Sequence, residues 1–410
     1  MAEAGIDAVV AASPANVRYL TGYWCWLAPL FREFMVRPGG SGALVLENFA
    51  LLPREGDSCL VIEPYWGLNA VDCVVDDVRL AGSAELAPAD GPASVDADLQ
   101  PLLEELSAGG WPADPVDVVA AALRDRGLDA SRIGVEVEAM QPSSLERLRA
   151  ALPGAALLDC TNLLRLVRAV KTASETELLA RAAQVAEEAA SDVVASMSPE
   201  STVDELTDRF RTLVAGGGAD LDHFSLSIDG LGFTTTGSRP LGAAGSLYFD
   251  FGCVRRGWFS DSGTTLSIGE PDPLALEQHA AVRDAIAAGA AAIRPGVRGS
   301  RVQDEMRRAL ADRGITRSFP HGHGLGLEVR DYPILVPDAG NVISDDCVEL
   351  GADLALEENM VLNLEAPVLT LGVRSVHCEQ TFVVTADGCR PLVEQDREAP
   401  LVAGRPRVEA

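Results

Sequence analysis

The 410-residue sequence predicts an α/β domain over residues 1–165, followed by an α+β domain over residues 166–410. The first observation is size, because a chain of this length with 47% hydrophobic residues can bury the cores of two domains. The second is that short apolar runs alternate with helix-period segments in the first half. The third is that strand-like runs dominate from residue 222 onward, with one helical block at 275–313 between them.

The elements of the first domain follow from apolar periodicity. Short apolar runs predict strands at 7–13, 42–47, 49–53, 59–64 and 133–138. Apolar positions with a period near 3.6 predict helices at 99–110, 115–127 and 143–152. Strands and helices that alternate along the chain are typical of α/β domains.

The second domain opens with two predicted helices, at 174–197 and 202–217. Ser174 and Glu177 have the spacing of a capping box, which would start the first of these helices. Strands are then predicted at 223–229, 246–252, 257–269, 360–369 and 379–385.

Charge narrows the classes of partner. With 61 acidic and 33 basic residues, the net charge is −28, which disfavours nucleic acids and anionic membranes. The sequence shows neither an uncharged apolar run long enough for a membrane span nor a signal peptide, so we expect a cytoplasmic protein. Eight scattered cysteines without a CxxC pair predict free thiols in a reducing compartment.

Two aspartates stand inside apolar strands in "LYFDFGCVRRGWFSDSGTTLSIG", residues 247–269. A hairpin that turns at Arg255–Arg256 would put Asp250 directly opposite Asp261 on one face. Like charges at that separation destabilise a sheet. We therefore expect a shared proton or a bound cation between them.

A second pair of acidic residues repeats this arrangement. Glu365 and Glu379 are symmetric about Gly372, which suits a turn, and His323 lies between the two hairpins in "PHGHGLGLEV". Each residue alone has a plainer interpretation, as a strand-edge acid or a packed histidine. Together, four carboxylates and one imidazole suit Mn²⁺, Fe²⁺ or Co²⁺ better than a structural zinc site, and the set is large enough for two cations.

The motifs "DFG…GWFSD", "GHGLGLEV", "NLEAPV" and "HCEQTFVVT" occur in this order. They resemble motifs of the pita-bread metallopeptidase superfamily, which includes creatinase, aminopeptidase P, prolidase and methionine aminopeptidase. "AGIDAVVAASPANVRYLTGY" and "LLRLVRAVKTASETEL" resemble the creatinase-type N-terminal domain. The resemblance implies a creatinase-like domain over 1–165 and a pita-bread catalytic domain over 166–410.

The resemblance also implies the roles of the five residues. Asp250 and Asp261 would bind metal, with Asp261 bridging two ions, and His323 would bind one ion. Glu365 would bind metal and act as general acid and base, and Glu379 would bridge both ions. The implied enzyme is a homodimeric, Xaa-Pro dipeptidase-like hydrolase that cleaves a C–N bond in a dipeptide or small amide. Its cofactors would be two divalent ions, with Mn²⁺ preferred and Fe²⁺, Co²⁺ or Zn²⁺ as alternatives.

The sequence departs from the family pattern at two helper histidines. One should stand about seventeen residues before the first aspartate, where the chain reads "GFTTTGSR" without histidine. The other position, seven residues after His323, holds Arg330. Arg330 is a candidate catalytic and substrate-binding residue that would grip a carboxylate bidentately, or else it pairs with Asp331.

Three further residues complete the candidate set. His377 is assigned to the catalytic group through a hydrogen bond to a ligating carboxylate, with a partly exposed strand histidine as the alternative. His321 is assigned to substrate binding, although a structural or surface role is its plainer interpretation, as it is for His223. In creatinase-like dimers an arginine reaches the neighbour's site, which makes Arg32 a candidate for binding the substrate carboxylate.

The departures leave other functions open. The same fold with altered helper residues would suit creatinase-type amidine hydrolysis or a lyase acting on a small charged substrate. A non-catalytic binding module is the third alternative, although modules of that kind lose ligands that this chain retains.

Overall fold

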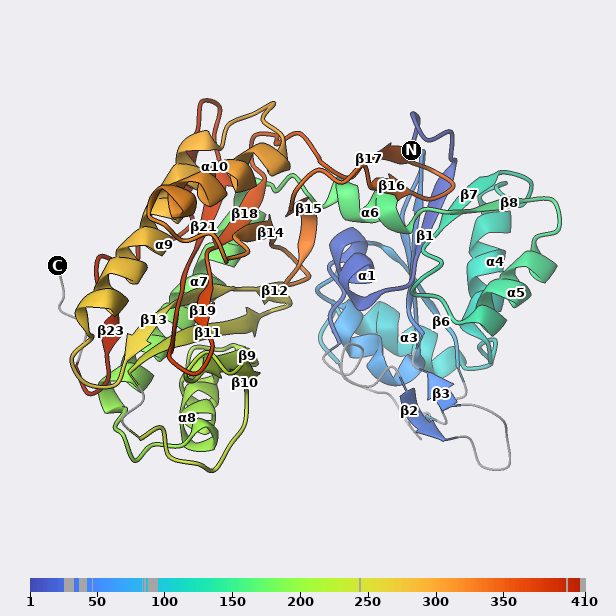
Figure 1. The fold of residues 1–410 in the computed structure, drawn as a ribbon. Helices are drawn as coiled ribbons and strands as arrows, with labels where there is room; N and C mark the ends of the chain where they lie inside the picture. Colours follow the sequence, from blue (N-terminus) through green and yellow to red (C-terminus); the bar gives the residue numbers. More distant parts are fainter. Residues whose placement is uncertain are drawn as a thin grey trace. The chain divides into compact units, whose positions relative to one another are not determined.

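The computed structural model describes the chain except residues 26–32, 37–42, 46, 83, 85, 88–94, 243–244, 396 and 406–410, and at 33–36 and 43–45 it describes only the backbone. It forms two compact units, Met1–Leu164 with Ile343–Leu350, and Arg165–Val342 with Gly351–Ala410 (Figure 1). Segment Ile343–Leu350, which the sequence places in the second domain, therefore packs with the first unit.

The first unit is an α/β domain built on a six-stranded sheet of order β6-β5-β4-β1-β7-β8. The strands are β1 (Ala8–Ala11), β4 (Phe49–Pro53), β5 (Cys59–Ile62), β6 (Asp77–Leu80), β7 (Arg132–Val135) and β8 (Ala156–Asp159). The helices are α1 (Pro14–Thr21), 3-10 helix η1 (Pro64–Ala70), α3 (Gln100–Ala108), α4 (Pro115–Asp125), α5 (Pro142–Ala151) and α6 (Thr161–Val167), which runs into the second unit. The apolar faces of α4 and α5 share a core with the sheet, as the periodicity predicts.

Two small hairpins accompany this sheet. They are β2 (Glu33–Val36) with β3 (Ala43–Val45), and β16 (Val342–Ser344) with β17 (Glu349–Gly351). In the second hairpin, Asp345 accepts hydrogen bonds from the backbone amides of Asn162 (2.7 Å) and Leu163 (3.2 Å). These bonds fasten the distant segment to the first unit because they satisfy free amides at the start of α6.

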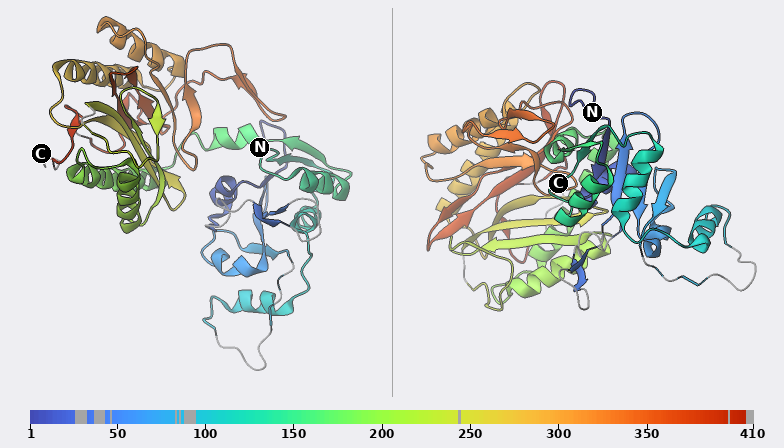
Figure 2. Two further views of the ribbon diagram at one scale, coloured as in Figure 1. Left: turned by 60° about the horizontal axis from the view of Figure 1, so that its bottom comes forward. Right: turned by 90° about the vertical axis from the view of Figure 1, so that its right-hand side faces the viewer.

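The second unit contains an eleven-stranded sheet whose main path is β10-β9-β11-β13-β21-β18-β14-β15. The right-hand view of Figure 2 shows these strands side by side, from yellow-green to red. Their bounds are β9 (Asp220–Ser227), β10 (Phe233–Thr234), β11 (Ser246–Arg255), β13 (Ser262–Ser267), β14 (His321–Gly324), β15 (Asp331–Leu335), β18 (Val361–Glu365) and β21 (Cys378–Val384). Strands β12 (Trp258–Phe259), β22 (Cys389–Pro391) and β23 (Leu401–Val402) pair beside this path, and β19 (Val368–Thr370) pairs with β20 (Arg374–Val376).

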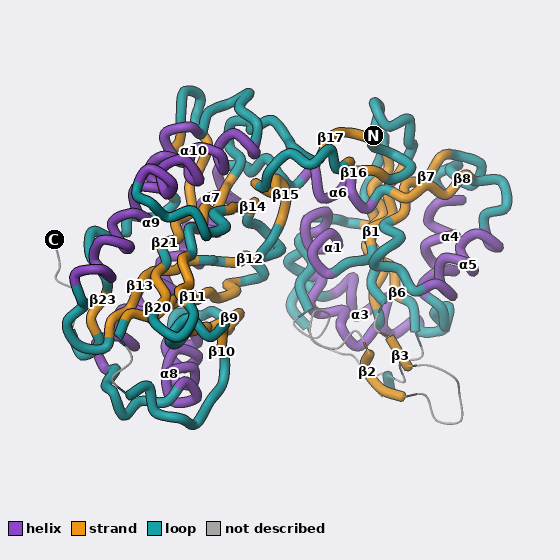
Figure 3. Tube along the Cα trace, viewed as in Figure 1, coloured by secondary structure: helices purple, strands orange, loops and turns teal. Residues whose placement is uncertain are grey.

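Paired helices cover this sheet (Figure 3). Helices α7 (Ala173–Ser196) and α8 (Val203–Gly216) pack on β9, β11 and β13 around Phe210 and Phe249. Helices α9 (Pro273–Ala292) and α10 (Gly299–Asp312) pack on β18 and β21 around Met306 and Leu362. The predicted α+β class of this half is confirmed, because the helices cover one face of a mostly antiparallel sheet.

The predicted capping box is wrong by two residues. Helix α7 begins at Ala173, and its N-cap is Thr172, whose hydroxyl accepts from the Glu175 amide while the Glu175 carboxylate accepts from the Thr172 amide. Ser174 and Glu177 lie inside the helix, where Glu177 pairs with Arg181 at 2.6 Å. Two Ser/Thr-x-x-Glu patterns overlap here, and the earlier one starts the helix.

Two predictions about the whole chain can be compared with the structure. All eight cysteines carry free thiols, as their spacing predicts. None of the helices in the described residues is long and apolar enough to cross a membrane. The cytoplasmic location stays a prediction.

Candidate metal centre

The polar residues of the second unit form a row across neighbouring strands of the sheet. Asp250 on β11 lies opposite Gly263 on β13, Gly263 opposite Glu379 on β21, and Glu379 opposite Glu365 on β18. The row ends at His321 on β14, opposite Glu365. Because residues opposite each other share a face of a sheet, these side chains project on one side.

Four more polar residues project from the same face, because side chains two residues apart on a strand point to the same side of the sheet. Asp261 precedes Gly263 by two residues, His323 follows His321 by two, and His377 precedes Glu379 by two. His223 stands two residues before Ser225, which lies opposite Asp250. Six strands, or the residues just before them, therefore bring these acids and imidazoles together: β9, β11, β13, β14, β18 and β21.

The register of the first hairpin differs from its prediction, so Asp250 does not face Asp261. Arg255 pairs with Trp258, and the turn residues are Arg256 (φ 51°) and Gly257 (φ 80°). Positive φ at both central residues defines the type I′ turn that two-residue hairpins prefer, and glycine favours this position over the predicted Arg-Arg turn. In the second hairpin the predicted pairing of Glu365 with Glu379 is confirmed, and Gly372 has φ 71° in its turn.

Asp261 lies in the break between β12 and β13 and meets two imidazoles. Its Oδ2 is 3.3 Å from His323 Nε2, and its Oδ1 is 3.3 Å from His223 Nε2. His323 Nε2 is also 3.2 Å from Glu365 Oε1, and His321 Nε2 is 3.0 Å from the same oxygen. Only 1% of the His323 side chain is exposed, and its Nε2 makes no hydrogen bond of good geometry. A buried nitrogen aimed between two carboxylates is the arrangement of a metal-binding imidazole.

Glu379 is the most enclosed of the four acids. Its side chain is 1% exposed; Asn363 donates to Oε1, and His377 Nε2 lies 2.9 Å from Oε2. His377 stacks on Tyr248 with ring centroids 3.9 Å apart, and the Tyr248 hydroxyl donates to Asp250 at 3.1 Å. The stacked pair therefore holds one carboxylate at each end.

Histidines keep two of the acids ionised. Burial alone would raise the pKa of Asp261, but His223 and His323 reverse the shift and bring this pKa well below its usual range. Burial likewise opposes the charge on Glu365, and contacts with His321 and His323 lower its pKa well below the usual value. Burial opposes the charge of His323 too, yet Asp261 and Glu365 raise its pKa to about 9.

The other two acids are shifted the opposite way. Burial raises the pKa of Glu379 far above its usual value, and the charges of Asp261 and Glu365 add to this shift. Burial also raises the pKa of Asp250, although the contact with His223 opposes it. The four acids repel one another, and divalent cations between them would allow all four to ionise.

A glycine leaves the space at the centre of the row. A Cβ on Gly263 would lie 2.5 Å from Glu379 Oε2 and 2.5 Å from His377 Cδ2. Two groups of side chains on either side have ligand atoms close enough to share an ion, His223–Asp250–Asp261 and Glu365–His377–Glu379. The described residues thus fit divalent cations in both donor chemistry and available space.

Arg330 lies at the open side of this cluster. Its side chain is 58% exposed, and its guanidinium is 3.5 Å from Glu365 Oε1. The predicted alternative of an Arg330–Asp331 ion pair is wrong, because Asp331 is buried and pairs with Arg168 at 3.3 Å. Arg330 is therefore close to the acids with an exposed donor surface.

The remaining candidates differ in what the structure shows of them. The side chain of His377 has no exposed surface, which excludes the exposed strand histidine and leaves it in contact with Glu379. His321 is a site residue with 18% of its side chain exposed, and its Nδ1 lies 2.9 Å from the Phe319 carbonyl oxygen. Arg32 lies outside the described residues. Its role and the homodimer stay predictions.

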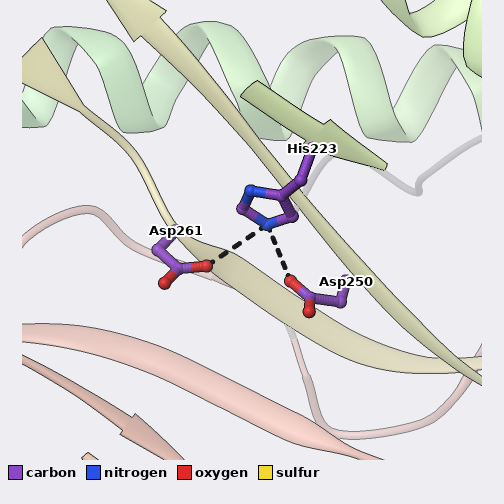
Figure 4. A group of neighbouring side chains, drawn as sticks. All are labelled: His223, Asp250 and Asp261. Carbon is purple, nitrogen blue, oxygen red and sulfur yellow. Dashed lines mark hydrogen bonds and ion pairs between the residues drawn. The ribbon is translucent and has the colours of Figure 1, made fainter. Parts of the chain in front are cut away.

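His223 is the residue that sequence reasoning missed. Figure 4 shows its Nε2 between Asp250 and Asp261, at 2.8 and 3.3 Å from their Oδ1 atoms. The sequence predicts a structural or surface role for it. The surface alternative is wrong, because strand β9 lies beside β11 and directs the ring at both aspartates. One feature could have identified it: His223 stands two residues before Ser225, which lies opposite Asp250, so both side chains project from the same face of the sheet. Recognising that feature required the β9–β11 register, and no short turn joins these strands.

Two family models match the chain. The model described as metallopeptidase family M24 matches residues 177–386, just over half of the chain. The model described as the creatinase/prolidase N-terminal domain matches residues 1–170.

Curated relatives and solved structures agree with these matches. The chain is 26% identical over 323 residues to the Xaa-Pro dipeptidase of Lactobacillus delbrueckii subsp. lactis, which covers 72% of this chain and 82% of that protein. It is 29% identical over 292 residues to the probable dipeptidase PepE of Mycobacterium bovis, covering 67% of this chain and 70% of that protein. The crystal structure of an X-Pro aminopeptidase from Thermotoga maritima superposes with a TM-score of 0.74 at 19% identity, covering 97% of this chain and 98% of that one. At this identity the structural likeness shows the fold.

Proposed function

The chain belongs to metallopeptidase family M24, and from this premise we propose that it hydrolyses the peptide bond of Xaa-Pro dipeptides with two divalent ions. The observation that carries the proposal is the row of acids across the sheet, with Asp250, Glu379 and Glu365 on adjoining strands and Asp261 beside them. The relatives named Xaa-Pro dipeptidase and probable dipeptidase support this substrate class.

The ions would be held by Asp250, Asp261, His323, Glu365 and Glu379. Oxygen donors dominate this set, so Mn²⁺ is the first choice, with Fe²⁺, Co²⁺ and Zn²⁺ as alternatives. When bound, such ions polarise a carbonyl oxygen and lower the pKa of water.

Glu365 is the proposed proton carrier. Its carboxylate is buried, ionised and within 3.5 Å of His321, His323 and Arg330. In this role it accepts a proton from the attacking water as the C–O bond forms. It then delivers that proton to the leaving nitrogen as the peptide C–N bond breaks.

The other site residues would bind the substrate or hold a metal-binding carboxylate in position. Arg330 would bind the C-terminal carboxylate of the dipeptide through its exposed guanidinium, since this planar group matches a carboxylate bidentately. His321 would contact the substrate beside Glu365. His377 is a positioning residue: it is wholly buried and acts through its hydrogen bond to Glu379.

One observation favours a second candidate function. Arg330 replaces a helper histidine of the family, and "GFTTTGSR" lacks the other. These changes would suit C–N hydrolysis or elimination on another small substrate that carries a carboxylate. Activity on a panel of both substrate types separates the two functions.

The test combines metal removal with a set of substrates. The full-length protein is stripped by chelation, reconstituted separately with each divalent ion, and assayed on Xaa-Pro dipeptides, their C-terminal amides, and creatine-like and betaine compounds. We expect no dipeptidase activity without metal and recovery with Mn²⁺. Glu365→Gln should lower kcat by about 10²–10⁴-fold, whereas Glu358→Gln, which alters an exposed loop acid, should not change it. Full activity of the stripped protein, or no dipeptide cleavage with any ion, would refute the proposal.

A further inference from the structure

We propose that His223 is a sixth metal ligand, bound to the ion that Asp250 and Asp261 hold, so that each ion has one imidazole. This inference rests on the proposed two-metal function. It adds a residue that neither the family resemblance nor the sequence pattern assigned to the metal.

The two carboxylate oxygens of Asp261 are placed symmetrically, each beside one imidazole. Asp261 Oδ1 is 3.3 Å from His223 Nε2, and Asp261 Oδ2 is 3.3 Å from His323 Nε2. Each imidazole also approaches one further acid, since His223 is 2.8 Å from Asp250 and His323 is 3.2 Å from Glu365. A carboxylate that bridges two ions presents one oxygen to each, and both oxygens here face a histidine.

The separations match donors that share one cation. Imidazole and carboxylate bind first-row divalent ions at about 2.1 Å, so two donors at right angles on one ion stand about 3.0 Å apart. The distances from His223 Nε2 to the two aspartate oxygens, 2.8 and 3.3 Å, lie on either side of this value.

The other ring nitrogen of His223 is held as it is in metal-binding histidines. Its Nδ1 lies 2.7 Å from the Asp222 carboxylate, and His323 Nδ1 lies 2.9 Å from the Gly324 carbonyl oxygen. Histidines that bind metal almost always donate their second N–H to a carboxylate or a carbonyl group. Both rings therefore direct Nε2 at the acids by the same means.

The backbone also leaves space for the ring. His223 lies opposite Gly252, where a Cβ would stand 2.4 Å from His223 Cε1. The side chain is 23% exposed, so the ring stands at the open side of the cluster, where an ion can reach it.

His321 provides the contrast within the same cluster. Its Nε2 approaches only Glu365, at 3.0 Å, among the described ion pairs. It does not stand between two acids as His223 and His323 do. His321→Ala is accordingly the matched control, since it removes an imidazole beside one acid without removing a proposed ligand.

The added imidazole should affect metal preference. The preference for Co²⁺ and Zn²⁺ over Mn²⁺ is stronger for imidazole nitrogen donors than for carboxylate oxygen donors. We expect His223→Ala to weaken Co²⁺ binding by about 10–100-fold or more, since even the loss of a group that only supports a ligand costs this much. The loss for Mn²⁺ should be smaller.

The test uses the full chain loaded with Co²⁺. Each imidazole bound to this ion that keeps a proton on its other nitrogen gives one strongly shifted, solvent-exchangeable proton NMR signal. We expect two such signals in the wild type and in His321→Ala, and one in His223→Ala. Titration against a competing chelator gives the accompanying loss of affinity.

Three outcomes would overturn the inference. One signal in the loaded wild type, or two in His223→Ala, would show that His223 does not bind the ion. Equal Co²⁺ affinity in the wild type and His223→Ala would show the same. In these cases the two-metal function stands if the wild type binds two ions. A wild type that binds no Co²⁺ would instead refute the metal centre itself.

Discussion

Gly263 offers a direct test of the geometry at the centre of the row. Its replacement by alanine would put a methyl group 2.5 Å from Glu379 Oε2 and 2.5 Å from His377 Cδ2. Ordinary contact begins at 3.4 Å, so these side chains must retreat by about 0.9 Å. Neither can swing away easily, because Glu379 is 1% exposed and His377 is fully enclosed.

The expected loss follows from this displacement. A misplacement of about 1 Å at a reacting site costs roughly 10²-fold in rate, so kcat/KM of Gly263→Ala should fall about 100-fold. Moving a carboxylate that both ions would share should also lower the metal content. Overpacking of this kind typically costs about 1–3 kcal/mol in the free energy of unfolding.

The assay measures bound metal per chain by elemental analysis, kcat/KM on an Xaa-Pro dipeptide, and thermal unfolding. Gly216→Ala is the matched control, since this glycine ends α8 and a Cβ added to it would meet no atom within 4 Å. Folded Gly263→Ala with wild-type metal content and kcat/KM would refute the assigned position of Glu379.

Two further predictions concern Arg330 and the buried Lys171. Arg330→Ala should raise KM at least about tenfold for dipeptides with a free carboxylate, because a charge-assisted hydrogen bond contributes about 1.5–3 kcal/mol. KM for the corresponding C-terminal amides should not change. Equal KM changes for both substrates would contradict the proposed binding of the carboxylate by Arg330. Burial, opposed by Asp331, lowers the pKa of Lys171 to about 8 from 10.5. Between pH 8 and 10.5, Lys171 is therefore protonated in the unfolded chain and mostly neutral in the folded protein. Stability rises with pH where the unfolded state binds more protons. The free energy of unfolding of the wild type, measured relative to that of Lys171→Met, should therefore rise by up to about 3 kcal/mol across this pH range. Urea unfolding at several pH values measures this difference, and a pH-independent difference would contradict the assigned burial.

The sequence predicted best where a short segment determined the geometry. Gly372 sets the turn between Glu365 and Glu379, and their pairing follows from symmetry about it. The first hairpin shows the limit, because moving the turn from Arg255–Arg256 to Arg256–Gly257 puts Gly263 opposite Asp250. A small register error therefore hid the glycine that makes room for Glu379.

Residues that meet through long-range strand pairing escaped the sequence altogether. Tyr248 and His377 stack across the sheet and hold Asp250 and Glu379, although 129 positions separate the two rings in the sequence. His223 has no feature of its own that separates it from a surface histidine. Its contacts exist because β9 pairs with β11.

The sequence by itself determined the two-domain architecture and the acids and imidazole proposed to hold metal, because apolar periodicity and local motifs encode strands, helices and turns. Only the tertiary structure decided which residues stand opposite one another, that Arg330 lies beside Glu365 and not paired with Asp331, and that His223 joins the two aspartates. Contacts of that kind depend on pairing between distant strands, and the free energy that selects this pairing comes from the packed core as a whole.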